Sequence, residues 1–248
     1  MDVLTTIPST AALTIDSHDL RNLLREKVGL KMLVELREGA RCACGAQASI
    51  AHFKVCRMFY APTKTHNAVE AEVARACRSI AAYQSQPRHL IPGSDARPDG
   101  LVYSAEISNG KASTAFDVAV VQPRPGAVGL AAAVTHEKVK RNTYRALGPL
   151  GINFEPLVME QSGGLGPSFL SFVRRISSQI QNNGDLAGQT WANSSTVAYF
   201  RQRIVIAQHR AMMQNIRLFS LYANTGIRAD FGDMARHAHA SRHRFQYN

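Results

Sequence analysis

Apolar residues recur at helical spacing in the first third of the chain. One pattern starts at Asp16 or Ser17, either of which can cap a helix by accepting backbone N–H groups, and it stops near Gly29. Its apolar positions are Leu20, Leu23, Leu24 and Val28. A second pattern follows a cysteine-bearing loop at residues 41–57. Its apolar face carries Val69, Val73, Cys77 and Ile80. We therefore predict two amphipathic helices, with Cys77 in the core of the protein.

The period of the pattern changes after Pro87, where two strand-like runs occupy residues 101–107 and 114–121. The segment between them contains Asn109-Gly110. An Asn-Gly pair between two such runs is a strong signal for a β-hairpin, because both residues accept the positive φ angles of a tight turn. The sequence therefore predicts an antiparallel pair of strands.

The rest of the chain alternates between helical and strand-like patterns. Residues 127–147 lack proline and stop before Gly148, as expected for a helix with glycine at its C′ position. The later predicted elements are a strand at 152–160, a helix opened by Pro167, a linker at 182–188 and a last helix at 194–223 that ends at Gly226. This order predicts an α/β fold, with a mixed sheet that contains the antiparallel hairpin and is flanked by helices.

Composition and charge narrow the class of partner. Of the 248 residues 45% are hydrophobic, so a disordered chain is not the expected state, and the net charge of +11 favours a polyanion such as nucleic acid. The last 48 residues carry eight Arg and two Asp. From this excess we expect Arg201, Arg203 and Arg210 to contact a nucleic-acid backbone. No apolar run is long enough to span a membrane, and the start of the chain does not resemble a secretion signal, so we expect an intracellular protein.

Three of the four cysteines crowd together beside a histidine, in an order that suits a metal site. The four candidate ligands are Cys42, Cys44, His52 and Cys56. Thiolates and an imidazole that close a small loop suit tetrahedral Zn²⁺, and a site with four protein ligands is usually structural. The alternative is that these are ordinary buried thiols with an incidental histidine.

Two aspartates are candidates for a second metal site. Asp99 stands at the start of the first hairpin strand, and Asp117 lies within the second. Strand alternation places Asp117 on the face opposite Phe116 and Val118, where an unpaired carboxylate would be unfavourable. Carboxylates from paired strands can converge on one divalent ion that prefers oxygen ligands, such as Mg²⁺. For Asp99 the alternative is an ordinary Pro-Asp-Gly turn.

A basic helical segment at 136–144 offers two lysines, Lys138 and Lys140. They point about 160° apart at the helical period, so only one can approach the sheet. Lys140 has the better position, because it shares a stripe with His136 beside the apolar Val139. A lysine near a metal site can stabilise negative charge that develops on a phosphate. The alternative is a solvent-exposed basic helix.

In this order, these pieces resemble the restriction-endonuclease-like C-terminal domain of site-specific non-LTR retrotransposon proteins, a member of the PD-(D/E)xK nuclease superfamily. The matching motifs are the knuckle of Cys42, Cys44, His52 and Cys56; Thr65-His66-Asn67 for Arg-His-Asn; Arg97-Pro98-Asp99 for Lys/Arg-Pro-Asp; Asp117-Val118; and Lys140-Arg141-Asn142-Thr143-Tyr144 for Lys-x-x-Lys-Tyr. The resemblance covers residues 41–175. Thr65 and Thr143 depart from the family pattern, and Ala119 holds the usual lysine position.

The resemblance implies a DNA endonuclease of retrotransposon origin. By that resemblance Asp99 and Asp117 would bind Mg²⁺ or Mn²⁺, and Lys140 would be the catalytic lysine. It also implies a structural Zn²⁺, a nuclear location, DNA and element RNA as partners, and nucleic-acid contacts by His66, Asn67, Arg97, Arg141 and Tyr144. We divide the chain into a helix and zinc-knuckle segment at 1–60, a nuclease-like domain at 61–182 and a basic helical segment at 183–248.

Several alternatives stay open at this stage. The chain can instead be a catalytically inactive nucleic-acid-binding remnant that keeps a zinc knuckle and basic helices, or an inert structural remnant. Such nucleases normally follow a polymerase domain, and the chain has no Tyr-x-Asp-Asp motif, so it resembles a severed or degenerate copy or a deliberately excised domain. Neither the oligomeric state nor a role of Glu70 or Glu160 as a further metal ligand follows from the sequence.

Overall fold

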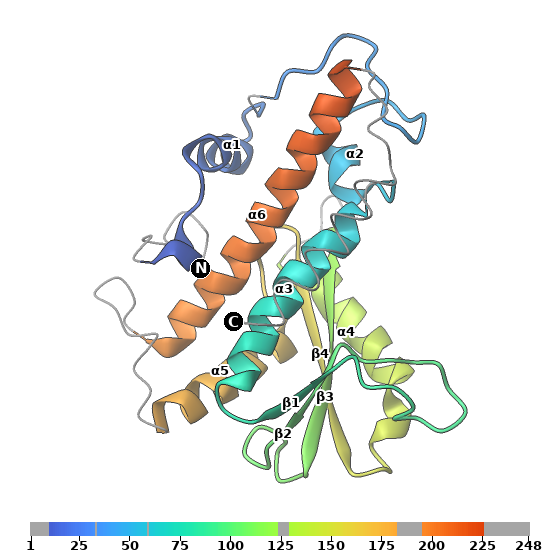
Figure 1. Cartoon of the computed structure of the whole chain (residues 1–248), viewed down its shortest axis with the longest axis vertical. Helices are drawn as coiled ribbons and strands as arrows, with labels where there is room; N and C mark the ends of the chain where they lie inside the picture. Colours follow the sequence, from blue (N-terminus) through green and yellow to red (C-terminus); the bar gives the residue numbers. More distant parts are fainter. Residues whose placement is uncertain (1–9, 33, 59, 124–128, 183–194, 226–248) are drawn as a thin grey trace.

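The computed structural model describes residues 10–32, 34–58, 60–123, 129–182 and 195–225. The helical elements are η2 (Ala11–Leu13), α1 (Ser17–Lys27), α2 (Ile50–Val55), α3 (Ala61–Arg78), α4 (Ala131–Thr143), η3 (Arg145–Leu147), α5 (Pro167–Asn182) and α6 (Thr196–Thr225); η2 and η3 are short 3₁₀ helices. The strands are β1 (Ala82–Ser85), β2 (Gly100–Tyr103), β3 (Ser113–Val121) and β4 (Ile152–Glu160). Figure 1 shows their arrangement.

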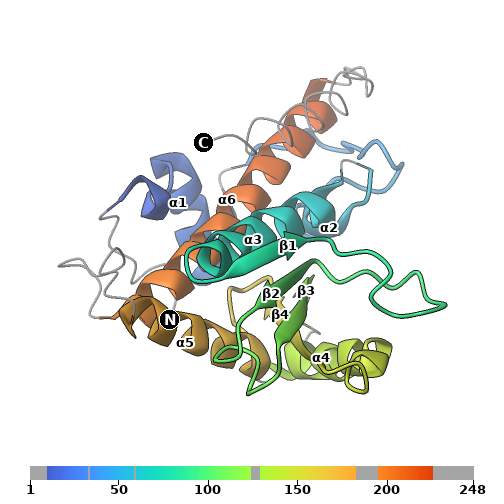
Figure 2. The same ribbon diagram turned by 60° about the horizontal axis from the view of Figure 1, so that its bottom comes forward.

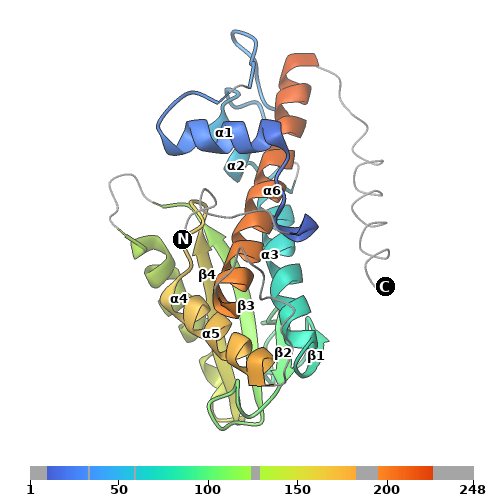
Figure 3. The same cartoon turned by 90° about the vertical axis from the view of Figure 1, so that its left-hand side faces the viewer.

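The four strands form one mixed sheet in the order β1-β2-β3-β4. The pairs β1–β2 and β2–β3 are antiparallel, whereas β3 and β4 are parallel. The sheet lies between α3 on one side and α4 on the other (Figures 2 and 3). The predicted α/β class, the antiparallel hairpin and the mixed sheet flanked by helices are therefore confirmed.

The main core lies on the face of the sheet that α3, α5 and α6 cover. Phe116 of β3 contacts Phe172 of α5, with ring centroids 5.6 Å apart. Cys77 of α3 is fully buried in the same cluster, so its predicted core position is confirmed. The opposite face carries a smaller cluster, in which the Tyr144 ring stacks on Phe154 at 4.4 Å. This smaller cluster leaves room on that face for polar side chains.

Helix α6 connects the sheet core to the cysteine-bearing segment. It has 30 residues, so it is about 45 Å long. Its first half contributes Tyr199 and Ile204 to the sheet core, and its second half packs against the region of α2, where Phe219 stacks on Phe53 at 4.9 Å. Figure 1 shows it running from beside α5 past α2. The division into segments 1–60, 61–182 and 183–248 stays a prediction.

The first hairpin strand is shorter than predicted. It ends at Tyr103, because the following residues form turns in which Ser108 N donates to Ser104 O at 3.1 Å and Gly110 N donates to Ala105 O at 3.0 Å. Asn109 and Gly110 both have positive φ angles, as the sequence predicts for this pair. The hairpin thus exists, but its connection spans residues 104–112.

The helix predicted at 127–147 also needs correction. Helix α4 covers Ala131–Thr143, and the tighter turn of η3 follows it. Gly148 has right-handed helical angles, so it does not act as a left-handed C′ glycine. The predicted apolar position Val139 is 54% exposed. The helix turns a different stripe towards the protein, with Ala133, Glu137 and Tyr144 buried.

Several short elements were not expected from the sequence. Helix α2 lies inside the predicted cysteine loop, and β1 is a four-residue edge strand with mostly exposed residues. The last helix ends at Thr225, and its predicted terminus Gly226 lies outside the described residues. Pro167 opens α5 as predicted. In the described part of the chain, no helix combines the length and the hydropathy that crossing a membrane requires.

Candidate active site and metal centre

The register between β2 and β3 places the two predicted acids next to each other. Gly100 pairs with Phe116, and Asp99 N donates to Phe116 O at 2.9 Å. The residue before Gly100 therefore lies opposite the residue after Phe116, which places Asp99 beside Asp117 on the same face of the sheet. This is the face that α4 covers. The structure thus brings together the two carboxylates that the sequence singled out.

Both oxygens of Asp99 have partners within the chain. Strand β2 begins just after Asp99, so it offers no backbone carbonyl to the N–H of Val118 in β3. Val118 N donates instead to Asp99 Oδ2 at 2.7 Å. His66 Nε2, from α3, lies 3.3 Å from Asp99 Oδ1. Burial disfavours the charged form of Asp99, but the interactions with His66 and Val118 outweigh burial and lower the pKa of this carboxyl group.

Asp117 is the more deeply buried acid, with 6% of its surface exposed. It forms an ion pair with Lys140, which α4 carries towards the sheet. Burial raises the pKa of Asp117 to about 6, and the favourable effect of Lys140 only partly offsets this. Lys138 is exposed. The prediction that Lys140 rather than Lys138 approaches the sheet is therefore confirmed.

His66 and Tyr144 complete the surroundings of the two acids. Burial lowers the pKa of His66, but Asp99 raises it more, so the net shift is upward. Burial raises the pKa of Tyr144, and the nearby charges of Asp117 and Asp99 act in the same direction. The side chains of His66 and Lys140 are 26% and 25% exposed. The site is thus reached by solvent at its rim, while its carboxylates lie deeper.

The two acids offer the type of ligand atom that a hard divalent cation takes, and binding of Mg²⁺ or Mn²⁺ by them stays a prediction. Asp99 and Asp117 supply carboxylate oxygens from neighbouring strands, and such oxygens are the ligands that Mg²⁺ and Mn²⁺ prefer. The raised pKa of Asp117 reflects burial that a cation would compensate. Glu70 and Glu160 were left open as further ligands. Glu160 is buried at the end of β4, and Glu70 lies one turn after His66 on α3, where it affects the pKa of His66.

The four predicted zinc ligands converge near the N-terminal part of the chain. The ligand atoms of Cys42, Cys44, His52 and Cys56 all lie within 4.8 Å of one another. The Sγ atoms of Cys42 and Cys56 are 3.7 Å apart, close to the edge of about 3.8 Å in a tetrahedron with Zn–S bonds of 2.3 Å. Cys44 Sγ lies 3.1 Å from His52 Nε2. The predicted Cys₃His cluster is confirmed as a geometric arrangement, and its occupation by zinc stays a prediction.

Local structure explains why these ligands meet. Gly45 N donates to Cys42 O at 2.8 Å, and Gly45 has a φ of +87°, so a tight turn brings Cys42 and Cys44 together. Helix α2 holds His52, and Cys56 follows one turn later, which places both on one side. Burial raises the pKa of Cys42 to about 12, so a bound cation would be needed to favour its thiolate.

The predicted nucleic-acid-binding residues occupy different environments. Arg97 is exposed, whereas Arg203 forms an ion pair with Glu72 at 2.8 Å, and Arg210 donates to the carbonyl of Ala11 at 2.6 Å. His66 and Tyr144 lie beside Asp99 and Asp117, and Asn67 and Arg201 are half-buried. Arg141 donates to Ser168 Oγ at 2.6 Å. Their contacts with nucleic acid stay predictions.

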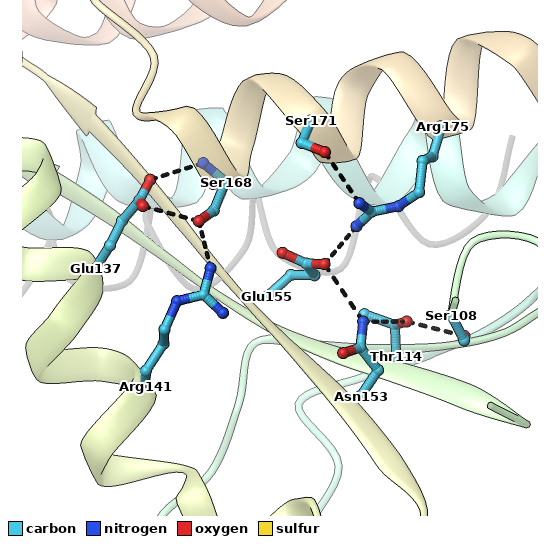
Figure 4. A network of polar contacts seen from close by, with 9 residues as sticks. All are labelled: Ser108, Thr114, Glu137, Arg141, Asn153, Glu155, Ser168, Ser171 and Arg175. Carbon is cyan, nitrogen blue, oxygen red and sulfur yellow. Dashed lines mark hydrogen bonds and ion pairs between the residues drawn. The ribbon is translucent and has the colours of Figure 1, made fainter. Parts of the chain in front are cut away.

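A polar network that was not predicted from the sequence lies beside the sheet (Figure 4). Arg175 of α5 donates to Glu155 of β4 at 2.5 Å, and Asn153 donates to the same carboxylate oxygen at 3.3 Å. Glu137 of α4 accepts bonds from Ser168 of α5. Acidic residues inside otherwise regular patterns at 137 and 155 were the only signal that could have pointed to this network.

Comparisons with known proteins were made against family models and curated sequences. No family model matches the chain, and the search of curated proteins found no similar sequence.

Proposed function

We propose that this protein is a metal-dependent endonuclease that hydrolyses phosphodiester bonds in DNA, with a site of the PD-(D/E)xK type. The observation that carries the proposal is the convergence of Asp99 and Asp117 on one face of the sheet, with the Lys140 amine paired to Asp117. Two acids with a lysine beside them suit phosphoryl transfer, in which catalysis depends on positioning and on stabilising negative charge.

In this proposal Asp99 and Asp117 hold one Mg²⁺ or Mn²⁺. The bound ion supplies positive charge to the scissile phosphate and lowers the pKa of a water molecule. His66 and the Val118 N–H orient Asp99, so that its carboxylate is preset before the ion arrives. Lys140, at the solvent-reached rim, stabilises negative charge on the phosphate.

The proposed substrate is DNA, because the net charge of +11 favours a polyanion and Arg97 is exposed close to the acids. Contacts of arginine with phosphate carry no sequence information. They neutralise phosphate charge and release counterions, so such binding weakens steeply with salt. Retrotransposon origin, a nuclear location and element RNA as a further partner rest on the order of the motifs. A structural Zn²⁺ in the Cys₃His cluster belongs to the same proposal.

Nicking of a supercoiled plasmid in Mg²⁺ tests the proposal. We expect the wild type to nick and Asp117→Ala to lose at least about a hundredfold in rate, because one of two ion ligands is gone. Asp95→Ala is the matched control, since Asp95 is an exposed acid four residues from Asp99. Equal nicking by the wild type and Asp117→Ala would refute catalysis by this site.

A second candidate function is a non-catalytic nucleic-acid-binding module. One observation favours it: both acids already have positively charged or hydrogen-bonding partners, Lys140 for Asp117 and His66 for Asp99. Binding of DNA that persists in Asp99→Ala, together with no Mg²⁺-dependent cleavage by the wild type, would support it. Binding no tighter than that of an unrelated basic protein at equal salt would instead indicate an inert remnant.

A further inference from the structure

Helix α4 presents an unusually polar side to the protein. Its inward stripe runs through Ala133, Glu137, Lys140 and Tyr144, at helical spacings of three and four. Two of these four positions are charged, and Glu137 is only 6% exposed. Polar contacts therefore contribute to the placement of the helix against the sheet.

Glu137 makes its contacts with the first turn of α5 (Figure 4). Ser168 N donates to Glu137 Oε1 at 3.0 Å, and Ser168 Oγ donates to Glu137 Oε2 at 2.8 Å. Ser168 is the second residue of α5, so its N–H has no partner inside the helix, and the carboxylate satisfies it. Arg141, one turn further along α4, donates to the same hydroxyl at 2.6 Å.

Gly166 leaves space for the Glu137 carboxylate, because glycine has no side chain. Gly166 N donates to Val158 O of β4 at 2.8 Å, which ties the loop before α5 to the sheet. A Cβ atom at Gly166 would lie 2.3 Å from Glu137 Oε1 and 2.8 Å from Val158 O. Any side chain at 166 would therefore displace the carboxylate or the loop. The Glu137–Ser168 contact thus links α4, α5 and β4 at one point.

We propose that Glu137 is a positioning residue for Lys140. The two residues lie one turn apart on the same side of α4, so the contact with Ser168 fixes the rotation of the helix that aims Lys140 at Asp117. Without it, α4 keeps buried Ala133 and Tyr144 and the bond from Arg141 to Ser168, none of which lies as close to Lys140 along the inward stripe as Glu137 does. The catalytic meaning of this positioning rests on the proposed nuclease function, whereas the placement of Lys140 can be measured without it.

The first test follows the placement of Lys140 directly. Brief labelling with an amine-reactive reagent, read by mass spectrometry, should modify Lys140 slowly in the wild type, because Lys140 is paired with Asp117, and exposed Lys138 quickly. In Glu137→Ala we expect the Lys140 rate to approach that of Lys138. Glu38→Ala, which removes an exposed acid, should leave both rates unchanged. Unchanged labelling of Lys140 in folded Glu137→Ala would overturn the proposal.

Ser168→Ala and Glu137→Gln keep the test decisive if Glu137→Ala fails to fold. Ser168→Ala removes one of the two bonds to Glu137 and keeps the backbone bond, so Lys140 labelling should rise by less than in Glu137→Ala. Glu137→Gln keeps an acceptor for Ser168 N and should largely restore slow labelling. Thermal unfolding of each variant reports whether the fold is intact. Wild-type labelling rates in a folded Ser168→Ala protein would count against the proposal.

Cleavage kinetics provide the second test. Glu137→Ala should lower kcat by about tenfold or more, as expected from losing a hydrogen bond to a charged group, with little change in KM. In a Lys140→Met background the same substitution should have no further effect on kcat. Equal losses in both backgrounds would show a general structural role and refute positioning through Lys140. If the wild type does not cleave DNA, the nuclease proposal fails while the labelling result still decides the placement.

Discussion

The Cys₃His cluster and the carboxylate site are assembled in opposite ways. All four cluster ligands come from one short segment, residues 42–56, and a tight turn and a six-residue helix bring them together. The carboxylate site draws His66 from α3, Asp99 and Asp117 from two strands, and Lys140 from α4. The first site therefore depends on local geometry, and the second on the register of the sheet.

The two sites also differ in the chemistry that would fill them. The cluster offers soft sulfur and nitrogen atoms, two of them on the buried residues Cys42 and Cys56. The carboxylate site offers hard oxygens that already interact with Lys140 and His66. An ion in the cluster would stabilise a fold, whereas an ion between the acids would compete with existing partners. The proposed structural role of the cluster and the proposed catalytic role of the acids rest on this difference.

The largest effect should come from breaking the cluster. Cys56→Ala should abolish zinc binding, which for structural zinc contributes on the order of 10 kcal/mol to folding. Elemental analysis of the wild type should find about one zinc per chain, and hydrogen exchange in Cys56→Ala should show residues 41–56 opening. Cys77→Ala is the control, because Cys77 is buried in the other core and should leave zinc content unchanged. Wild-type protein that folds without zinc would remove the metal from the cluster.

A smaller effect should follow from removing the lysine at the carboxylate site. Lys140→Met should lower the cleavage rate by about a hundredfold, because one charge that stabilises the phosphate is lost. Lys138→Met removes an equally long cation from the exposed side of the same helix and should cleave at close to the wild-type rate. Equal losses in the two variants would mean that α4 acts only through its overall charge.

The pairing of β2 with β3 can be tested by adding a side chain at Gly100. A Cβ atom there would lie 2.4 Å from Phe116 Cζ and 2.7 Å from Tyr83 Cε2. Gly100→Ala should therefore destabilise the protein by about 1–3 kcal/mol and displace the adjacent Asp99. Gly148→Ala is the control, since its Cβ would meet nothing closer than Arg145 O at 3.5 Å. Chemical denaturation measures both. A neutral Gly100→Ala would contradict the tight β2–β3 packing that holds the acids together.

The smallest effect should come from Asp19 of α1, which pairs with Arg217 of α6, and it should appear as a change of stability with pH. Burial raises the pKa of Asp19 above its ordinary value, and the ion pair with Arg217 only partly offsets this. A carboxyl group with a raised folded-state pKa stabilises the fold at low pH and loses that contribution as pH rises through the folded pKa. The wild type should therefore lose stability as pH rises from 3.8, whereas Asp19→Asn lacks this titrating group. The unfolding free energy of Asp19→Asn minus that of the wild type should increase over the same range.

Comparing both proteins at each pH cancels any effect of the metal sites. Asp95→Asn, at an exposed position, should show no such trend. A difference between Asp19→Asn and the wild type that stays constant from acid to neutral pH would contradict the raised pKa of Asp19.

Sequence reasoning succeeded where a feature depends on short-range spacing. Asp16 caps α1 as predicted, with its side chain accepting from His18 N at 2.9 Å, and the cysteine ligands meet because turns and helices bring positions a few residues apart together. The choice of Lys140 over Lys138 also required only the helical period. These inferences need no knowledge of which elements are neighbours in space.

The pairing of Asp99 with Asp117 was predicted from the hairpin, but several other features that depend on tertiary contacts were missed. The contact of His66 with Asp99 joins α3 to the start of β2, and its resemblance-based role was nucleic-acid binding. Val139 was expected on the inward side of α4, but buried Glu137 takes that side because Ser168 satisfies its carboxylate. Strand β1 could not be predicted from the sequence, because its residues are mostly exposed and lack an alternating pattern.

Binding of a paramagnetic ion tests the carboxylate site most directly. Titration of zinc-loaded wild-type protein with Mn²⁺, followed by electron paramagnetic resonance, should show about one bound Mn²⁺ per chain. The double variant Asp99→Asn, Asp117→Asn should show none, while Asp95→Asn should bind like the wild type. Wild-type protein that leaves all Mn²⁺ free, or a double variant that binds Mn²⁺ unchanged, would contradict a shared ion between Asp99 and Asp117.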